Sequence, residues 1–188
     1  MSGGGETSPR IYASQEAGGL DGASRWYALA VKPRHEKAVH RILETKGQET
    51  FLPLYRKPHR YARRQKAFHL PLFPGYVFCR CNIGKRQPIV TTPGVIRILG
   101  SGSEATPIED SEIASLQLAI NAQAAIEPWP FLQAGEKVWI TEGALAGVEG
   151  ILIEAKQGPR IILSVSLLQR SVLLEVDRAV VRSVSAPR

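Results

Sequence analysis

Apolar and polar positions alternate with different periods in the two halves of the chain. Arg25–Val31 is apolar on both faces of an expected strand, which is typical of a central strand covered on both sides. Between Pro33 and Gly47 the apolar residues recur at helical spacing, so we expect an amphipathic helix that begins near Pro33 and stops at Gly47. Further elements are expected as strands at Thr50–Leu54, Tyr76–Arg80 and Val95–Leu99, a short helix within Asn82–Thr92, and a helix after Glu109 with Ile113, Leu116 and Ile120 buried.

The second half of the chain carries the pattern of strands alone. These are expected at Lys137–Thr141, Gly150–Ala155, Arg160–Val165, Ser171–Val176 and Val180–Val184. Short strands at this spacing predict a small barrel that closes its own edges. Ala122–Phe131 contains Pro128-Trp129-Pro130 between two unlike halves, and we place the linker there.

The stretch Leu70–Arg80 joins a turn to a strand. Pro71 and Pro74 bracket Leu72 and Phe73, and Pro74-Gly75 is a strong turn signal. Because proline removes backbone donors, we expect Leu72 and Phe73 near a sheet edge or on the surface. An apolar aromatic fixed on a stiff turn is a candidate for docking a partner.

Charge is distributed unevenly along the chain, whose formal net charge is +7. Arg25 to Ser103 holds sixteen basic and three acidic residues, and Thr50 to Ser103 holds no acidic residue. Glu104 to Phe131 carries five acidic residues and no basic one. The basic residues from Arg25 to Ser103 predict a face that binds nucleic acid. The alternative is a solvated surface that has no partner.

Tyr55–His69 is the most basic segment, with six Lys or Arg residues and the aromatic residues Tyr61 and Phe68 among them. Its periodicity leaves open a twisted hairpin or a mobile loop. Basic side chains interspersed with aromatic ones suit a single-stranded DNA or RNA, whereas aromatic residues in such a segment also serve local packing.

Several classes of protein are excluded or disfavoured. Met1–Ser24 is rich in Gly and Ser and lacks the features of a signal peptide, so we expect a disordered leader on a cytoplasmic protein. Cys79 and Cys81 are expected as free buried thiols. The most basic stretch has no carboxylates to hold metal ions, and no nucleophile motif appears, so we expect neither an enzyme nor a bound metal or cofactor.

In order and spacing, several motifs resemble the NusG family of bacterial transcription elongation factors, and in particular its specialised UpxY, RfaH and LoaP types. The matching residues are Trp26-Tyr27-Ala28-Leu29, Lys32-Pro33-Arg34-His35-Glu36-Lys37, Pro71–Phe78, Thr92-Pro93-Gly94-Val95, Gly135-Glu136-Lys137-Val138 and Gly143 through Gly150. The resemblance implies an α+β fold, with an N-terminal NGN α/β sandwich and a C-terminal five-stranded KOW barrel of the SH3-like type. The expected boundaries are a leader at 1–24, the NGN domain at 25–125, a linker at 126–133 and the KOW domain at 134–185.

By this resemblance, the first domain docks on the clamp helices of the largest subunit of RNA polymerase. The positions that match the docking patch are Ala30, Pro53, Leu72, Phe73, Pro74 and Tyr76. The expected nucleic-acid ligand is upstream or non-template DNA, and nascent RNA stays open as a further ligand. The residues expected to bind it are Lys32, Arg34, His35, Lys37, Arg41, Arg60, Arg63, Arg64 and Lys66. Lys85-Arg86-Gln87-Pro88 stands where RfaH-type factors carry a polar motif for a second polymerase contact.

In the KOW domain, Leu167, Leu168 and Arg170 occupy the turn that in NusG meets a small-subunit ribosomal protein, with Rho as a further candidate partner. Family members have a glycine near this turn, and this chain has none there. RfaH-like proteins can fold this domain as a helical hairpin, whereas the alternating Val and Ile pattern here favours strands. The expected function is that of a monomeric elongation factor that suppresses pausing and termination on particular operons. The alternative is a ribosome- or RNA-binding KOW protein that acts without RNA polymerase.

Overall fold

The computed structural model describes residues 22–61, 64–101, 104–129, 135–155 and 158–184. Its helices are α1 (Glu36–Thr45), α2 (Gln87–Val90) and α3 (Asp110–Asn121), with short 3-10 turns at Ile83–Lys85, Ser166–Leu168 and Arg178–Val180. Its strands are β1 (Arg25–Val31), β2 (Glu49–Phe51), β3 (Leu54–Tyr61), β4 (Arg64–Pro71), β5 (Tyr76–Cys81), β6 (Val95–Ile98), β7 (Gly100–Ser101), β8 (Glu104–Ala105), β9 (Ile126–Trp129), β10 (Glu136–Ile140), β11 (Glu149–Ala155), β12 (Gly158–Val165), β13 (Arg170–Glu175) and β14 (Val181–Ser183). Within these residues, no helix is long and apolar enough to cross a membrane.

A four-stranded antiparallel sheet in the order β2-β5-β1-β6 forms the first domain. β1 lies between β5 and β6, and most of its side chains are buried, which confirms the prediction of a central strand covered on both faces. The short helix expected within Asn82–Thr92 is α2, and Pro88 fits because it stands in the first turn, where no intrahelical donor is required.

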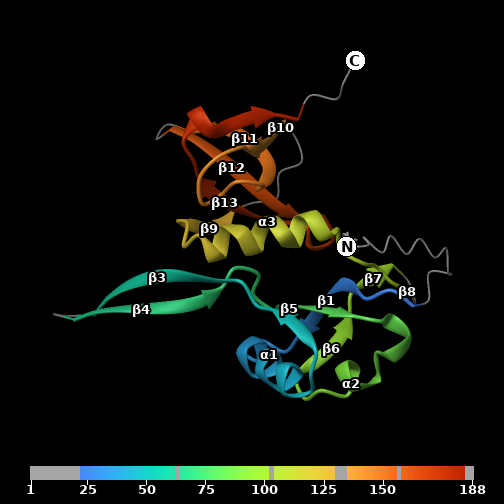
Figure 1. Cartoon of the computed structure of the whole chain (residues 1–188). Helices are drawn as coiled ribbons and strands as arrows, with labels where there is room; N and C mark the ends of the chain where they lie inside the picture. Colours follow the sequence, from blue (N-terminus) through green and yellow to red (C-terminus); the bar gives the residue numbers. More distant parts are fainter. Residues whose placement is uncertain (1–21, 62–63, 102–103, 130–134, 156–157, 185–188) are drawn as a thin grey trace, which may run out of the picture.

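The two faces of this sheet are covered by different helices (Figure 1). α1 and α2 cover one face, where Val39, Leu43 and Ile89 pack against side chains of β1 and β5. The other face is covered by α3, and there Ile113 and Leu116 belong to one core with Trp26 and Phe78. Helix α3 therefore closes the sandwich that the sequence predicts.

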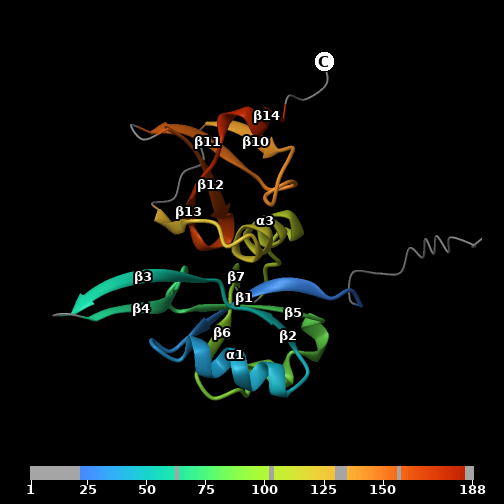
Figure 2. The same cartoon turned by 60° about the vertical axis from the view of Figure 1, so that its left-hand side comes forward.

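The core under α3 continues into the second domain. Val138, Ile161 and Leu174 of the second sheet belong to the same buried cluster as Ile113 and Phe78. Figures 1 and 2 show α3 lying between the two sheets. The two domains thus share one hydrophobic core, which local sequence patterns did not predict.

The second domain is an antiparallel sheet in the order β14-β10-β11-β12-β13-β9. The five expected strands are confirmed as β10 to β14 within a residue or two at each end. The pairings of the described residues form an open six-stranded sheet, so the expected closed five-stranded barrel is not confirmed. The sixth strand, β9, lies in the first part of the expected linker and pairs with β13.

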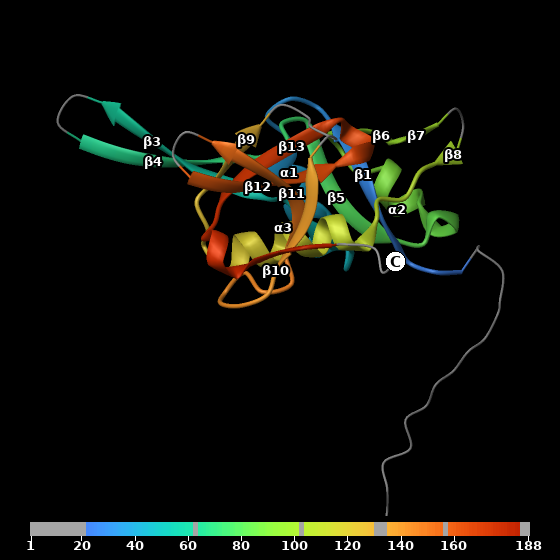
Figure 3. The same ribbon diagram turned by 90° about the horizontal axis from the view of Figure 1, so that it is seen from above.

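The basic segment Tyr55–His69 is a hairpin, which decides between the two alternatives that the sequence left open. β3 and β4 pair with each other over their full length, from Leu54 opposite Pro71 to Tyr61 opposite Arg64. They form a sheet of their own, and the hairpin projects away from the body of the protein (Figures 1 and 3). Its base therefore joins the first domain, and the rest of the hairpin extends away from it (Figure 1).

Two contacts fix the start of α1 against neighbouring loops. The Gly75 amide donates a hydrogen bond of 2.9 Å to the carboxylate of Glu36, a buried residue in the first turn of α1. On the other side, the Lys32 amide donates to the Gly94 carbonyl at 2.8 Å. The first turn of α1 is therefore tied to the turn that carries the expected docking residues, and the loop that precedes α1 is tied to Gly94.

Replacing Gly94 should destabilise the first domain, because this position requires a left-handed backbone conformation and also leaves no space for a side chain. Gly94 has a φ of +97°, and a Cβ at this position would lie 2.9 Å from Val39 Cγ2 and 3.3 Å from His35 Cβ. We expect Gly94→Ala to lower the free energy of unfolding by about 2–4 kcal/mol, measured by urea denaturation. The control is Gly47→Ala, where φ is +74° and the space is open, with an expected loss of about 1 kcal/mol. Equal losses would contradict the crowding argument.

Removing the Glu36 carboxylate should loosen the turn at Pro74-Gly75. Glu36→Ala leaves the Gly75 amide without its acceptor, so we expect a loss of about 1–3 kcal/mol and faster hydrogen exchange at that amide. Glu44→Ala is the matched control, because this glutamate on the same helix is exposed and its carboxylate lies 3.6 Å from the His40 ring nitrogen. Unchanged exchange at Gly75 in Glu36→Ala would refute the role of this contact.

Candidate nucleic-acid and protein interface

The six residues expected to dock on the polymerase are brought together around the turn between β4 and β5. Ala30 of β1 is paired in register with Tyr76 of β5, and the Leu72 amide donates to the Pro53 carbonyl at 2.9 Å. The turn closes through a hydrogen bond from the Tyr76 amide to the Phe73 carbonyl at 3.1 Å. The six positions therefore form one corner of the first domain.

The expectation that Leu72 and Phe73 lie on the surface is wrong for this arrangement. Their exposed fractions are 2 % and 1 %, and Pro53 is buried as well. The Phe73 ring packs edge-on against Phe78, with 5.6 Å between the ring centres. Proline does keep this pair out of the sheet ladder, but the core shared with α3 and the second domain covers their side chains.

Tyr76 remains half-buried at the edge of this corner and is covered by the second domain. The guanidinium carbon of Arg170 lies 5.5 Å from the centre of the Tyr76 ring. A cation over an aromatic face is attracted by the ring's electron density. Arg170, expected to bind a partner of the KOW domain, therefore contacts a residue expected to bind polymerase.

A second polar contact lies beside this one. The Ser166 hydroxyl donates a hydrogen bond of 2.7 Å to Oε1 of Glu112 on α3. The Ser166 amide donates to the same oxygen at 3.2 Å. Ser166 opens the turn that contains Leu167 and Leu168, which are half-buried and buried, respectively. The turn ends at Gln169, whose φ of +50° is the left-handed conformation that glycine adopts most readily.

These contacts place the two predicted protein-binding surfaces against each other. The residues that link them are Tyr76 and Glu112 on the first domain and Ser166 and Arg170 on the second. In this closed arrangement, each predicted surface is covered in part by the other.

The cationic residues expected at the start of α1 are all exposed, as predicted. They are Lys32, Arg34, His35, Lys37 and Arg41. Arg34 has a φ of +66°, which is uncommon for a residue with a side chain. Two basic elements far apart in sequence meet here, because Lys37 Nζ donates to the His69 carbonyl at the base of the hairpin, at 2.8 Å.

The structure describes the side chains of only some of the basic residues on the hairpin. Arg63 lies outside the described residues, and although Arg60, Arg64 and Lys66 lie in β3 and β4, their side chains lie outside them as well. Nearer the base, Arg56, Lys57 and His69 are exposed. The described cations therefore run from the start of α1 on to the hairpin.

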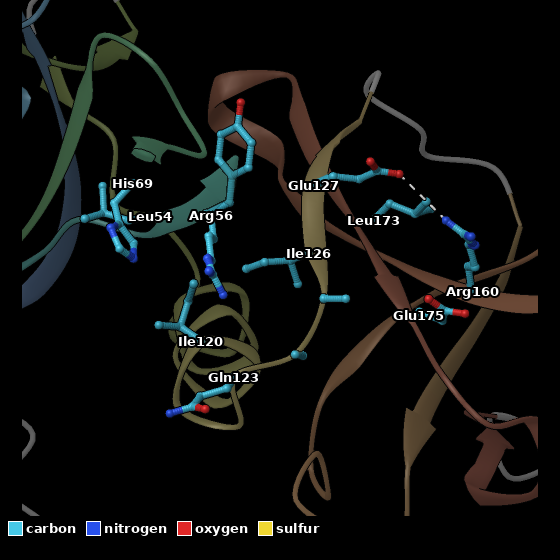
Figure 4. A pocket seen from close by; sticks show the side chains of 13 residues that line it. Leu54, Arg56, His69, Ile120, Gln123, Ile126, Glu127, Arg160, Leu173 and Glu175 are labelled. Carbon is cyan, nitrogen blue, oxygen red and sulfur yellow. Dashed lines mark ion pairs between the residues drawn. The ribbon is translucent and has the colours of Figure 1, made fainter. Parts of the chain in front are cut away.

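A groove of about 850 Å³ separates the hairpin base from the second domain (Figure 4). Arg56 and His69 line it from the hairpin, and Ile120 lines it from the end of α3. The wall from the second domain holds Glu127 and Arg160, whose charged groups are 3.7 Å apart.

Several residues important to this interface were not identified from sequence. Glu36 belongs to a recognised motif, but nothing local indicates that its carboxylate reaches a turn 39 positions away. The pair formed by Glu112 and Ser166 was not identified either. Their partners are distant in sequence, so no periodicity could have indicated them.

The remaining reactive groups do not form a chemical site in the described part of the chain. Cys79 and Cys81 are free and buried, as predicted. The hydrogen bond with Cys81, together with burial, raises the pKa of the Cys79 thiol, which keeps it protonated. Within the described ranges, no three His, Cys, Asp or Glu side chains gather as metal ligands would.

Comparisons with known proteins agree with this architecture. The family model "Transcription termination factor nusG" matches residues 24–117. A protein named transcription termination/antitermination protein NusG from Helicobacter pylori strain J99 is 25 % identical over 169 residues, covering 80 % of this chain and 93 % of the relative. The protein of the same name from Rickettsia bellii is 23 % identical over 165 residues, covering 81 % and 86 %.

Among solved structures, one described as domain interaction in Thermotoga maritima NusG is similar in fold, with a TM-score of 0.50 and 18 % identity. It matches over 86 % of this chain and 98 % of its own. The family match, which spans the first sheet and most of α3, takes in both the docking corner and the basic hairpin. The chain therefore belongs to the NusG family of transcription factors.

Proposed function

We propose that this protein binds transcribing RNA polymerase through the corner around Tyr76 and binds upstream or non-template DNA through the start of α1 and the hairpin. The observation that carries the proposal is the position of α1 between these surfaces. Its first turn holds the docking turn through Glu36 and Gly75, and its next residue, Lys37, holds the hairpin through His69. One short element thus sets the distance between a protein-binding and a nucleic-acid-binding surface.

Such a protein would bridge polymerase and DNA and suppress pausing. A bridge that binds the closed clamp of the polymerase more tightly than the open one shifts the equilibrium towards the closed, elongating state. The coupling can be no larger than that difference in affinity. Among NusG-type factors, we assign this chain to the antiterminators that act on particular operons, because of its Lys32–Lys37 and Pro71–Phe78 motifs.

Binding to polymerase requires the domains to separate at the Tyr76 corner. In the closed arrangement Arg170 covers Tyr76, and Phe73 is 1 % exposed. The apparent affinity for the polymerase clamp helices is then reduced by the fraction of molecules that are open. Once freed, the second domain offers Leu167, Leu168 and Arg170 to a ribosomal protein or to Rho.

We expect Tyr76→Ala to lower the affinity for core RNA polymerase at least tenfold, because an aromatic anchor is removed. Glu112→Ala should raise that affinity about fivefold, because losing the bonds to Ser166 weakens the closed state by ~1 kcal/mol. Asp110→Ala is the control, since it removes a carboxylate from the same turn of α3. Tyr76 is a better probe than Phe73, whose truncation in a core costs about 3–5 kcal/mol of stability.

The readout is the equilibrium binding of the full chain to purified polymerase, followed by pause lifetimes on a defined template. Unchanged binding in Tyr76→Ala would contradict docking through this corner. Co-purification provides a separate check against the ribosome- or RNA-binding alternative, because polymerase subunits would support the proposal and ribosomal RNA alone would refute it.

Nucleic-acid binding should weaken when charge is removed from the start of α1. Arg34→Gly and Lys37→Gln should each lower the affinity for DNA and reduce the slope of log K against log salt by about 1, as expected for a phosphate contact. Glycine is chosen at position 34 because it accepts the φ of +66°. Arg182→Gln, a charge change on the second domain, is the control. If the salt dependence of all three variants equals that of the parent, the assignment of DNA binding to the start of α1 is wrong.

A further inference from the structure

The groove between the hairpin base and the second domain has the size and the position of a small-molecule site. Its volume is about 850 Å³. Small-molecule and cofactor sites typically occupy about 300–1,000 Å³ and often lie between domains. The first domain lines the groove with Arg56, His69 and Ile120, and the second sheet lines it with Glu127, Arg160 and Glu175 (Figure 4). A ligand in this groove touches both domains at once.

The two walls of the groove carry different charged groups. On the hairpin, Arg56 and His69 stand opposite each other in the strand register, and both are exposed. On the second sheet, Glu127 and Glu175 are exposed. The Arg160 side chain is 14 % exposed, and its guanidinium lies 3.7 Å from the Glu127 carboxylate. The hairpin wall therefore attracts an anionic group, and the other wall offers carboxylate oxygens that accept hydrogen bonds.

Apolar side chains also line the groove. Ile120 of α3 and Ile126 of β9 are half-buried, and Leu173 of β13 is buried. A flat heterocyclic ring gains free energy when it leaves water to cover such side chains. The groove thus combines a wall for an anion, acceptors for hydrogen bonds and an apolar surface for a ring.

One glutamine that lines the groove adopts a conformation in which glycine is favoured. Helix α3 ends at Asn121, and Gln123 has a φ of +53°. The turn is closed by the Ala124 amide, which donates to the Ala119 carbonyl at 3.1 Å. Helices commonly end in this way with a glycine at the left-handed position. A glutamine there instead brings to the groove a side-chain amide that can donate and accept hydrogen bonds.

We propose that this groove binds a nucleoside phosphate. The phosphate lies against Arg56 and His69, the base covers the apolar side chains, and its amino groups donate to Gln123 or to the carboxylates of the opposite wall. A purely apolar ligand would desolvate the charged walls without pairing them. Inorganic phosphate would leave the apolar side chains in water. The same chemistry occurs in a free nucleotide and at the 5′ end of an RNA strand.

Because both domains line the groove, the ligand stabilises the closed arrangement. Its effect on transcription rests on the proposed function, in which polymerase binding requires the domains to separate. A ligand that binds only the closed form, present at about ten times its Kd, lowers the open fraction about tenfold. The apparent affinity for polymerase falls by the same factor.

The test measures binding to the full chain by isothermal titration calorimetry. The probes are GDP, pyrophosphate and a 5′-phosphorylated RNA trinucleotide that begins with guanosine. Arg56→Gln removes the cation, and Gln123→Gly removes the amide but keeps a residue that accepts the φ of +53°. Lys57→Gln is the first control, because Lys57 is the next residue of β3 and does not line the groove. Gln169→Gly is the second, because Gln169 has the same left-handed conformation away from the groove.

At least one of GDP and the RNA should bind with a Kd below about 1 mM and more tightly than pyrophosphate. Arg56→Gln should weaken that binding about tenfold and Gln123→Gly about fivefold, whereas the controls should change it less than about twofold. Tighter binding of the RNA than of GDP assigns the site to a strand end, and the reverse order assigns it to a free nucleotide. Failure of both to bind, equal binding of pyrophosphate, full affinity in Arg56→Gln or equal losses in the controls would overturn the proposal.

A second measurement tests the coupling to polymerase. The probe that binds, at about ten times its Kd for the parent, should lower the affinity of the parent for core RNA polymerase about tenfold and that of Arg56→Gln only about twofold. No change in the parent would refute the coupling. Nucleotide binding is measured without polymerase, so failure of the proposed function in Tyr76→Ala would leave that result standing, and the two failures are distinguishable.

Discussion

The burial of both faces of α3 is the constraint on which the rest of the structure depends. Its buried residues include Ile113 and Leu116, which face a core shared by both sheets, and Ser115, which accepts a hydrogen bond from the Glu149 amide of the second domain. A helix buried on only one side would leave two independent domains. Here the apolar face of the first sheet, the docking turn and the second sheet all depend on the same twelve-residue helix.

The polar contacts around this core are few and lie at its edge. The Glu112–Ser166 hydrogen bonds and the stacking of Arg170 on Tyr76 involve partly exposed groups. Contacts of this kind contribute modestly and are exchanged easily for contacts with water or a partner. The apolar core therefore supplies most of the free energy of closure, while the edge determines which surfaces are covered.

Local patterns in the sequence predicted the individual elements well, because each reflects local burial. The central strand β1, the end of α1, and the strands of the second domain follow from periodicity and turn residues. The expected start of α1 near Pro33 is wrong: the helix begins at Glu36, because Arg34 has a φ of +66° and interrupts the helical conformation. The exposure of the basic residues on α1 also followed, since Lys37 and Arg41 lie away from the apolar side of the helix. Family resemblance added the order of the domains.

Contacts between distant segments could not be predicted in the same way. Phe73 was expected on the surface because its flanking prolines exclude it from a ladder, but a residue outside a ladder can still be covered by another domain. The first part of the expected linker became β9 because β13 offered it an edge. The candidate site lies where such long-range contacts gather, so its residue types could be predicted but not its accessibility.

The pairing of β9 with β13 also determines how far apart the domains can travel. While β9 stays paired, only Ala122–Ala125 connects it to α3, and four extended residues span roughly 14 Å. If β9 detaches, the eight residues Ala122–Trp129 can extend, and their maximum span is roughly 28 Å. If the second domain separates as proposed, the strength of the β9–β13 pairing therefore sets the distance that this domain can move from α3.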